Sequence, residues 1–212
     1  MYSENYNMCT RFFIDCSNEE LNEIVETALL TKTAEKFMLA VTPMKRSGEI
    51  KPTDVVPVIA PAPSGKPSVY AMRWGYSIPG KTTKLFNART ETASSKPTFK
   101  TDWQRHRCII PASYYFEWEH LKDEKGRTKT GDKYLIQPKG YSTTWLCGLY
   151  HIEEGLPSFV VLTRNPSDSV SHIHNRMPLI LPKERIPEWT SPDGEPDIVK
   201  EYALTEMVAE KV

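Results

Sequence analysis

Cys9 lies near the start of the chain, in the stretch Met8-Cys9-Thr10-Arg11-Phe12. A cysteine that becomes the first residue after loss of a preceding methionine carries its α-amine and its thiol on adjacent carbons. Such a 1,2-aminothiol reacts with an aldehyde, because the amine forms an imine and the thiol closes that imine into a five-membered thiazolidine. An α-amine also has a lower pKa than a lysine amine, so more of it is neutral at pH 7. The position of Cys9 therefore indicates amino-terminal thiol chemistry.

Seven residues precede Met8, and while they remain attached the nitrogen of Cys9 is an amide that cannot form a thiazolidine. Three explanations fit the sequence. Translation starts at Met8, or residues 1–8 are a lead or propeptide that is removed, or the cysteine works in some other way and the chain does not cross-link.

Three further clusters of polar residues interrupt apolar stretches. Asn87 and Arg89 lie in NARTET, Glu117 lies in YFEW, and His174 and Arg176 lie in HNRMP. Each has an ordinary structural explanation: an asparagine that caps a turn, an outward-facing acid on a strand, a loop histidine bonded to the backbone, and surface arginines. No single cluster is specific by itself.

The strand around Glu117 makes one of these explanations testable. Alternation places Phe116 and Trp118 on one face, and Tyr115 and Glu117 on the other. If the Tyr115 face is buried as well, Glu117 is a carboxylate in an apolar wall. Burial would then raise its pKa and suit it to proton transfer.

Taken together and in this order, the clusters resemble the SOS-response-associated peptidase (SRAP) family, whose members cross-link to abasic sites in single-stranded DNA. The resemblance runs from Met8 to about Leu181. Its motifs are the Cys-x-Arg-Phe start, Arg73-Trp74-Gly75-Tyr76, Asn87-Ala88-Arg89-x-Glu91-Thr92, Cys108-Ile109-Ile110-Pro111-Ala112 with Phe116-Glu117-Trp118, and His174-x-Arg176-Met177-Pro178-Leu179. One departure is Thr10, where the family commonly has glycine.

The resemblance implies a role for each matching position. Cys9 would form the thiazolidine with the ring-opened deoxyribose aldehyde, and Asn87 would orient its α-amine. Glu117 would act as acid and base during imine formation and during autoproteolytic removal of the preceding residues. His174 would be the second proton-transfer group, acting on the sugar and in reversal of the link.

The same resemblance implies how DNA is held. Arg11, Arg89 and Arg176 would contact phosphates, for which the planar guanidinium fork is suited. Trp74 would stack at the junction between single strand and duplex, and such stacking contributes roughly 1–3 kcal/mol per base.

The overall composition neither indicates nor excludes binding to DNA. Lys plus Arg and Asp plus Glu number 27 each, so the net charge is zero and DNA would have to be held by a local basic patch.

The first residues contain no apolar run typical of a signal peptide, and no stretch approaches the ~20 apolar residues of a membrane span. The scattered cysteines favour a reducing, cytoplasmic location, with Cys16, Cys108 and Cys147 packed in the core. We expect no metal, no cofactor and no obligate protein partner.

The elements that must position these residues are mostly strands. Short β-branched and aromatic runs predict a β-rich α+β fold with a barrel-like mixed or antiparallel sheet, formed by a single domain over residues 9–212. Ser17 and Glu20 form a capping-box pattern that predicts a helix over 18–31. Further helices are expected over 98–105 and 166–173. The proline inside the run 55–60 predicts an edge strand there.

Two other functions remain open from the residues alone. One is a thiol peptidase or amidohydrolase with Cys9 as nucleophile and His174 as base. The other is a non-catalytic module that binds single-stranded nucleic acid.

Overall fold

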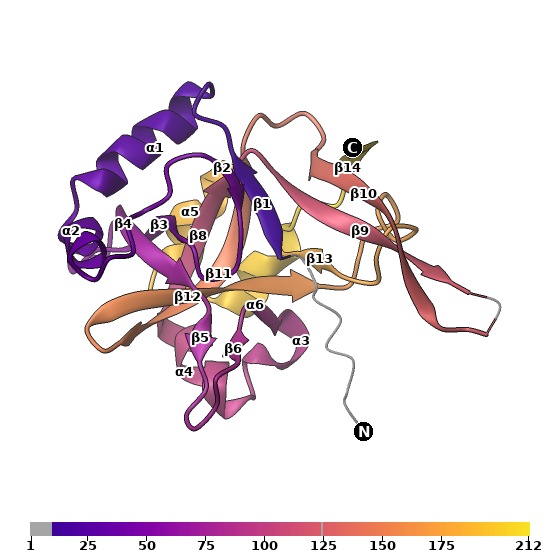
Figure 1. Cartoon of the computed structure of the whole chain (residues 1–212). Coiled ribbons are helices and arrows are strands. Elements are labelled where there is room, and N and C mark those ends of the chain that lie inside the picture. The colour runs from indigo at the N-terminus through magenta and orange to yellow at the C-terminus, as the bar shows by residue number, and fades with distance from the viewer. Residues whose placement is uncertain (1–9, 124) are drawn as a thin grey trace.

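The computed structural model describes residues 10–123 and 125–212, and its central feature is a closed barrel (Figure 1). The barrel strands are β3 (Val55–Pro61), β4 (Pro67–Trp74), β8 (Arg107–Ala112), β11 (Thr144–Glu153) and β12 (Leu156–Arg164). They pair in the order β11-β8-β3-β4-β12, and the β11–β12 pairing closes the ring. Only the β4–β12 pair within this ring is parallel. The expected β-rich, barrel-like α+β fold is confirmed.

A second, antiparallel sheet extends from one end of the barrel. Its order is β14 (Met207–Lys211), β10 (Thr128–Pro138), β9 (Tyr114–Lys122), β1 (Arg11–Ile14) and β2 (Gly48–Ile50). Ser113 alone separates β8 from β9, and its N–H donates to the carbonyl of Phe13 at 2.8 Å. The hydroxyl of Thr144, on β11, donates to the carbonyl of Ser113 at 2.9 Å. One continuous stretch of chain therefore ties the barrel to the second sheet.

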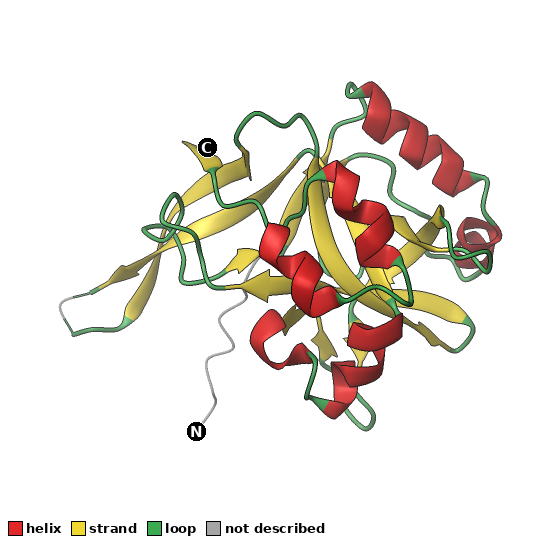
Figure 2. Cartoon of the chain, turned by 180° about the vertical axis from the view of Figure 1, so that it is seen from behind, coloured by secondary structure: helices red, strands yellow, loops and turns green. Residues whose placement is uncertain are grey.

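Short strands complete the region where the two sheets meet. β7 (Asn87–Arg89) runs parallel to β12 on one edge, and β13 (Met177–Pro178) runs antiparallel to it on the other. β5 (Tyr76–Ser77) and β6 (Lys84–Leu85) form a separate ribbon. In Figures 1 and 2 the start of β1 lies beside β13 and the C-terminal end of β12. Segments far apart in sequence thus converge at one place.

The helices pack against the outside of the strands (Figure 2). They are α1 (Glu19–Leu29), α2 (Lys32–Leu39), α3 (Thr90–Ala93), α4 (Pro97–Arg105), α5 (Ile186–Thr190) and α6 (Pro196–Val199), with 3-10 turns at Lys183–Arg185 and Lys200–Tyr202. None of the helices in these described stretches is long and apolar enough to cross a bilayer.

Three expectations about local structure need correction. The cap of α1 is Asn18 rather than Ser17, because the Asn18 side chain accepts the N–H groups of Glu20 and Leu21. Residues 166–173 form turns and not a helix. β3 is not an edge strand, since it pairs with both β4 and β8. Its pairing with β8 is confined to Ile59 and Ile109, so the N–H that Pro57 lacks is not needed.

Candidate functional site

Glu117 is a buried carboxylate. Its exposed fraction is 3%, and Tyr115, two residues earlier on the same face of β9, is 1% exposed. One carboxylate oxygen accepts the N–H of Trp118 at 3.2 Å. The opposite face of the strand is covered too, because the ammonium of Lys133 lies 3.7 Å from the centre of the Phe116 ring. The condition set by the sequence is met: the acid lies in an apolar wall.

The register of β1 on β9 brings the start of the described chain to this carboxylate. Arg11 pairs with Phe116 and Phe12 with Tyr115. The same antiparallel register, continued by one residue, sets Thr10 opposite Glu117. Cys9 itself lies outside the described residues.

Arg11 belongs to a small cluster of charge on the same sheet. Its Nε lies 3.2 Å from a carboxylate oxygen of Glu49, and the ammonium of Lys133 lies 3.0 Å from the other oxygen. Burial alone would raise the pKa of Glu49, but its hydrogen bond from Lys133 and the two positive charges lower it. Two cations share one carboxylate, so the cluster keeps a surplus positive charge.

Asn87 and Arg89 sit on the same face of β7. Asn87 pairs with Val161 of β12, and Arg89 pairs with Thr163. Ala88, between them, points into the core. Asn87 is half-buried whereas Arg89 is exposed. β7 therefore places the half-buried side-chain amide of Asn87 and the exposed guanidinium of Arg89 on one face.

Trp74 does not form a stacking platform. It is fully buried between Phe12 and Phe159, with ring centroids 5.2 and 6.0 Å away. Its indole N–H donates to the carbonyl of Phe86 at 2.9 Å. The expectation that Trp74 stacks on a base is contradicted, because neither face of the indole is open to one. Trp74 is a residue of the hydrophobic core.

The Arg73-Trp74-Gly75-Tyr76 motif instead helps to position Asn87 by packing against the preceding residue, Phe86. Gly75 has φ of 121°, and a Cβ there would lie 2.7 Å from the ring of Phe86. Only glycine permits this approach. Trp74 and Gly75 together fix Phe86, the residue immediately before Asn87.

Arg176 is also used internally. Its two terminal nitrogens donate to the two carboxylate oxygens of Glu91 at 2.6 and 2.8 Å. The same nitrogens donate to the Asn165 side chain at 2.7 Å and to the Thr163 carbonyl at 2.8 Å. Its side chain is only 9% exposed. The geometry does not support Arg176 as a phosphate contact, since its fork is already occupied by a carboxylate.

His174 is 3% exposed, and its Nδ1 contacts the backbone of Arg176. Nδ1 lies 3.0 Å from the backbone nitrogen of Arg176 and 3.2 Å from its carbonyl oxygen. A neutral ring whose Nδ1 accepts the Arg176 N–H, the shorter of these two contacts, carries its proton on Nε2. Nε2 is buried and has no hydrogen-bond partner among residues 10–123 and 125–212. Burial, together with the charge of His120, lowers the pKa of His174 to about 4. The ring is therefore neutral at pH 7.

One large apolar cluster includes neighbours of the predicted residues from both sheets. Tyr115, on the Glu117 face, shares one apolar cluster with Val161, Ile173 and Met177. Val161 is the partner of Asn87, and Ile173 and Met177 flank the segment that carries His174. Glu117, Asn87 and His174 each lie next to, or pair with a neighbour of, residues in this cluster, and Arg11 and Arg89 are the candidate phosphate contacts.

The sequence analysis missed several residues that hold the predicted site residues in place. Glu91, Asn165 and Thr163 hold Arg176, and the ring of His120 lies 4.0 Å from that of His174. The position of Glu91 inside the NARTET motif could have indicated that this residue takes part in the site. Nothing in the local sequence pointed to His120.

A family model for SOS response associated peptidase (SRAP) matches residues 8–212. The chain belongs to the SRAP family. Among relatives, the SRAP chain is 33% identical over 156 residues to abasic site processing protein YoqW from Bacillus subtilis, covering 66% of this chain and 67% of that protein. It is 34% identical over 125 residues to abasic site processing protein YedK from Escherichia coli, covering 55% and 52%.

Solved structures share the SRAP fold of this chain. A crystal structure of a protein from Bacteroides thetaiotaomicron covers 96% of this chain and 92% of its own, with a TM-score of 0.70 at 18% identity. A phage-related protein from Bordetella bronchiseptica gives a TM-score of 0.66 at 20% identity, covering 96% and 94%. Both likenesses concern the fold alone.

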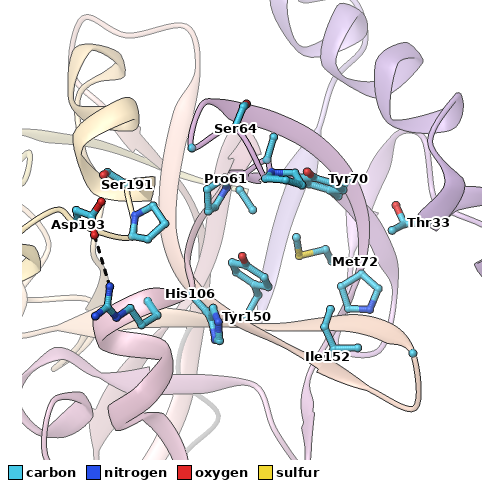
Figure 3. A pocket seen from close by; sticks show the side chains of 18 of the residues that line it. Thr33, Pro61, Ser64, Tyr70, Met72, His106, Tyr150, Ile152, Ser191 and Asp193 are labelled. Atoms are coloured by element: carbon cyan, nitrogen blue, oxygen red, sulfur yellow. Dashed lines mark hydrogen bonds and ion pairs between the residues drawn. The ribbon is translucent and has the colours of Figure 1, made fainter.

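A large open pocket lies elsewhere on this SRAP chain. Its volume is about 970 Å³, and its lining includes Tyr70, Met72, His106 and Tyr150 (Figure 3). It also includes Gly155, at the hairpin that precedes β12. None of the predicted site residues within the described stretches lines it. The converging region described above lies instead at the C-terminal end of β12.

The remaining cysteines do not compete with Cys9 for thiol chemistry. Cys108 and Cys147 are fully buried, and burial raises the pKa of both thiols well above their usual range. Cys16 is half-buried, and its thiol donates to the carbonyl of Arg46 at 3.3 Å. The expectation of core packing is met for Cys108 and Cys147, and only in part for Cys16.

Proposed function

We propose that this SRAP protein captures abasic sites in single-stranded DNA through a thiazolidine formed by an unblocked Cys9. Its relatives YoqW and YedK bear the name abasic site processing protein, which supports abasic DNA as the substrate class. The observation that supports the finer proposal is the β1–β9 register, which pairs Arg11 with Phe116, the residue immediately before the buried Glu117. Thr10, the first residue that the structure describes, directly follows Cys9 in the sequence.

The proposed chemistry is an addition, a loss of water and a ring closure. The cyclic hemiacetal of the abasic sugar opens when its ring oxygen gains a proton and its hydroxyl loses one. The α-amine of Cys9 adds to the resulting aldehyde, and water leaves to give an imine. The thiol sulfur then bonds to the imine carbon, and its proton passes to the nitrogen. Glu117, buried but able to exchange protons, serves the first two steps.

His174 contributes a neutral imidazole with its proton on Nε2. Such a ring donates a hydrogen bond to a sugar oxygen without adding a positive charge beside the amine. The attacking amine must be neutral. A nearby carboxylate such as Glu117 favours its ammonium form, so Glu117 must take up the proton that the amine loses. In this proposal Glu117 handles the proton and His174 orients the sugar.

Exposing the amine requires that residues 1–8 be absent. We propose that the chain either starts at Met8 and then loses this methionine, or loses residues 1–8 through self-processing assisted by Glu117. Intact mass of the purified chain separates these routes. The full-length mass in Glu117→Gln and a shortened mass in the unaltered chain would support self-processing, whereas identical shortened masses would exclude a role for Glu117 in it.

The deciding experiment uses a single-stranded oligonucleotide with one abasic site and a denaturing gel. We expect a shifted band for the unaltered protein and for Cys16→Ala, and no band for Cys9→Ala. The mass of the product should equal protein plus DNA minus one water. A band that survives in Cys9→Ala overturns the proposal.

Glu117→Gln tests the proton-transfer step on the same gel. Removing a general acid or base slows such reactions by roughly 10²–10⁴-fold. Glu119→Gln, a half-exposed carboxylate on the same strand, is the matched control and should react at the unaltered rate. Equal rates in all three proteins would remove Glu117 from the mechanism.

A further inference from the structure

Two histidines meet beside the predicted catalytic residues. The ring of His120, on β9, lies against that of His174 with centroids 4.0 Å apart and planes at 61°. The backbone N–H of His120 donates to the carbonyl of Ile173 at 2.9 Å. Strand and loop are therefore joined one residue away from the ring contact, and the two rings are fixed by backbone as well as by packing.

The orientation of His174 needs such support. Its Nδ1 contacts the backbone of Arg176, whereas Nε2 is buried with no hydrogen-bond partner in the described part of the chain. A buried donor without a partner costs about 1–3 kcal/mol. A ring free to turn would leave this orientation. Arg176 holds one side of the imidazole, and the ring of His120 packs against it from the second sheet.

We propose that His120 is a positioning residue of this site, one that fixes the imidazole of His174 and keeps it neutral. The inference rests on the proposed cross-linking function, because it assigns His120 a part in the same reaction. Once His120 is protonated, a proton on His174 would set two positive rings 4.0 Å apart in a poorly hydrated site. Coulomb repulsion opposes that state.

The other charged groups around the pair act in the same direction. Arg176, from the loop of His174 itself, and Lys122, from β9, are both cations that disfavour a further proton. Glu117 and Glu119 are the acidic residues that precede His120 on β9. His172 faces away, toward Tyr134 of β10. Burial, followed by the charge of Lys122, lowers the pKa of His120 itself.

The test follows the imidazole signals of His174 by NMR titration in the full chain. We expect the pKa of His174 to rise from about 4 toward its ordinary 6.5 in both His120→Phe and His120→Gln. His120→Phe keeps a ring in place and removes only the charge. His172→Gln, an exposed histidine of the same loop, is the control and should leave His174 unchanged.

The cross-linking rate supplies a second readout. The ratio of variant to unaltered rate should be lowest near pH 5 and should recover toward pH 8. In the variants His174 has a higher pKa and is therefore protonated in the range of about pH 5 to 8, where histidine ordinarily titrates, whereas in the unaltered protein it stays neutral there. A purely structural defect would lower this ratio equally at all pH values. Such a pH-independent ratio would contradict the proposal, as would an unchanged His174 titration in both variants.

The two proposals fail in different ways. If the unaltered protein forms no covalent product, the cross-linking function is wrong, and the NMR titration still decides whether His120 keeps His174 neutral. If the product forms but the titration of His174 is the same with and without His120, only the role of His120 is wrong.

Discussion

The guanidinium of Arg176 binds both carboxylate oxygens of Glu91, at 2.6 and 2.8 Å, and so joins the loop after His174 to the start of α3. The hydrogen bond from Arg176 lowers the pKa of Glu91, which keeps the carboxylate charged. The backbone of Arg176 also contacts Nδ1 of His174, so the Arg176–Glu91 ion pair helps to hold His174 in place.

Arg176→Lys should therefore cost stability and activity together. A lysine cannot reproduce the two-pronged contact, and hydrogen bonds to charged groups contribute about 1.5–3 kcal/mol. We expect the free energy of unfolding in urea to fall by about 2 kcal/mol. Arg89→Lys, at an exposed position, is the control and should unfold like the unaltered protein. Equal stability of the two variants would show that the Glu91 contact contributes little.

Arg89→Ala should weaken DNA binding without affecting the fold. Arg89 is exposed on the face of β7 that carries Asn87, where a phosphate can reach it. Loss of one phosphate contact reduces the slope of log affinity against log salt by about 0.7 for a single strand. Fluorescence anisotropy with an undamaged oligonucleotide measures this slope. Lys139→Ala, an exposed lysine after β10, serves as control, and an unchanged slope in Arg89→Ala would exclude the contact.

Trp74→Phe separates a core role from a stacking role. The change keeps an apolar ring but removes the donor to the Phe86 carbonyl, so stability should fall by about 1 kcal/mol. Affinity for intact single-stranded DNA should stay the same. A loss of affinity with unchanged stability would instead restore Trp74 as a base platform.

The stability contributed by His151 should depend on pH. Its nitrogens lie 3.3 Å from Asp102 and 2.7 Å from Glu153. Burial alone would lower the pKa of His151, but the hydrogen bonds to these carboxylates outweigh it and raise the pKa. A pKa raised on folding gives stability that is fully present below the unfolded value of about 6.5 and is lost as pH rises through the folded value.

His151→Gln should consequently destabilise the protein more at about pH 5.5 than at about pH 9. Urea unfolding at the two pH values gives the difference, with His172→Gln as the exposed control. A penalty that is equal at both pH values would mean that the charge of His151 adds nothing to the fold.

Residues whose environment is set by nearby sequence were predictable. The alternation around Glu117 correctly separated the Tyr115 face from the Phe116 face, and the strands of the barrel followed from short β-branched runs. The role of Trp74 was missed because burial depends on Phe12 and Phe159, which lie far away in sequence. His120 was missed for the same reason: its contact with His174 joins two sheets across more than fifty residues of chain.

β1 has a partner along both edges, β9 on one side and β2 on the other. Tension pulling on the chain ahead of Arg11 would load these two ladders in shear. Hydrogen bonds loaded in that direction share the force and break together, whereas bonds at a frayed edge open one after another. Any molecule attached to the beginning of the chain would be anchored to a strand that is paired along both of its edges.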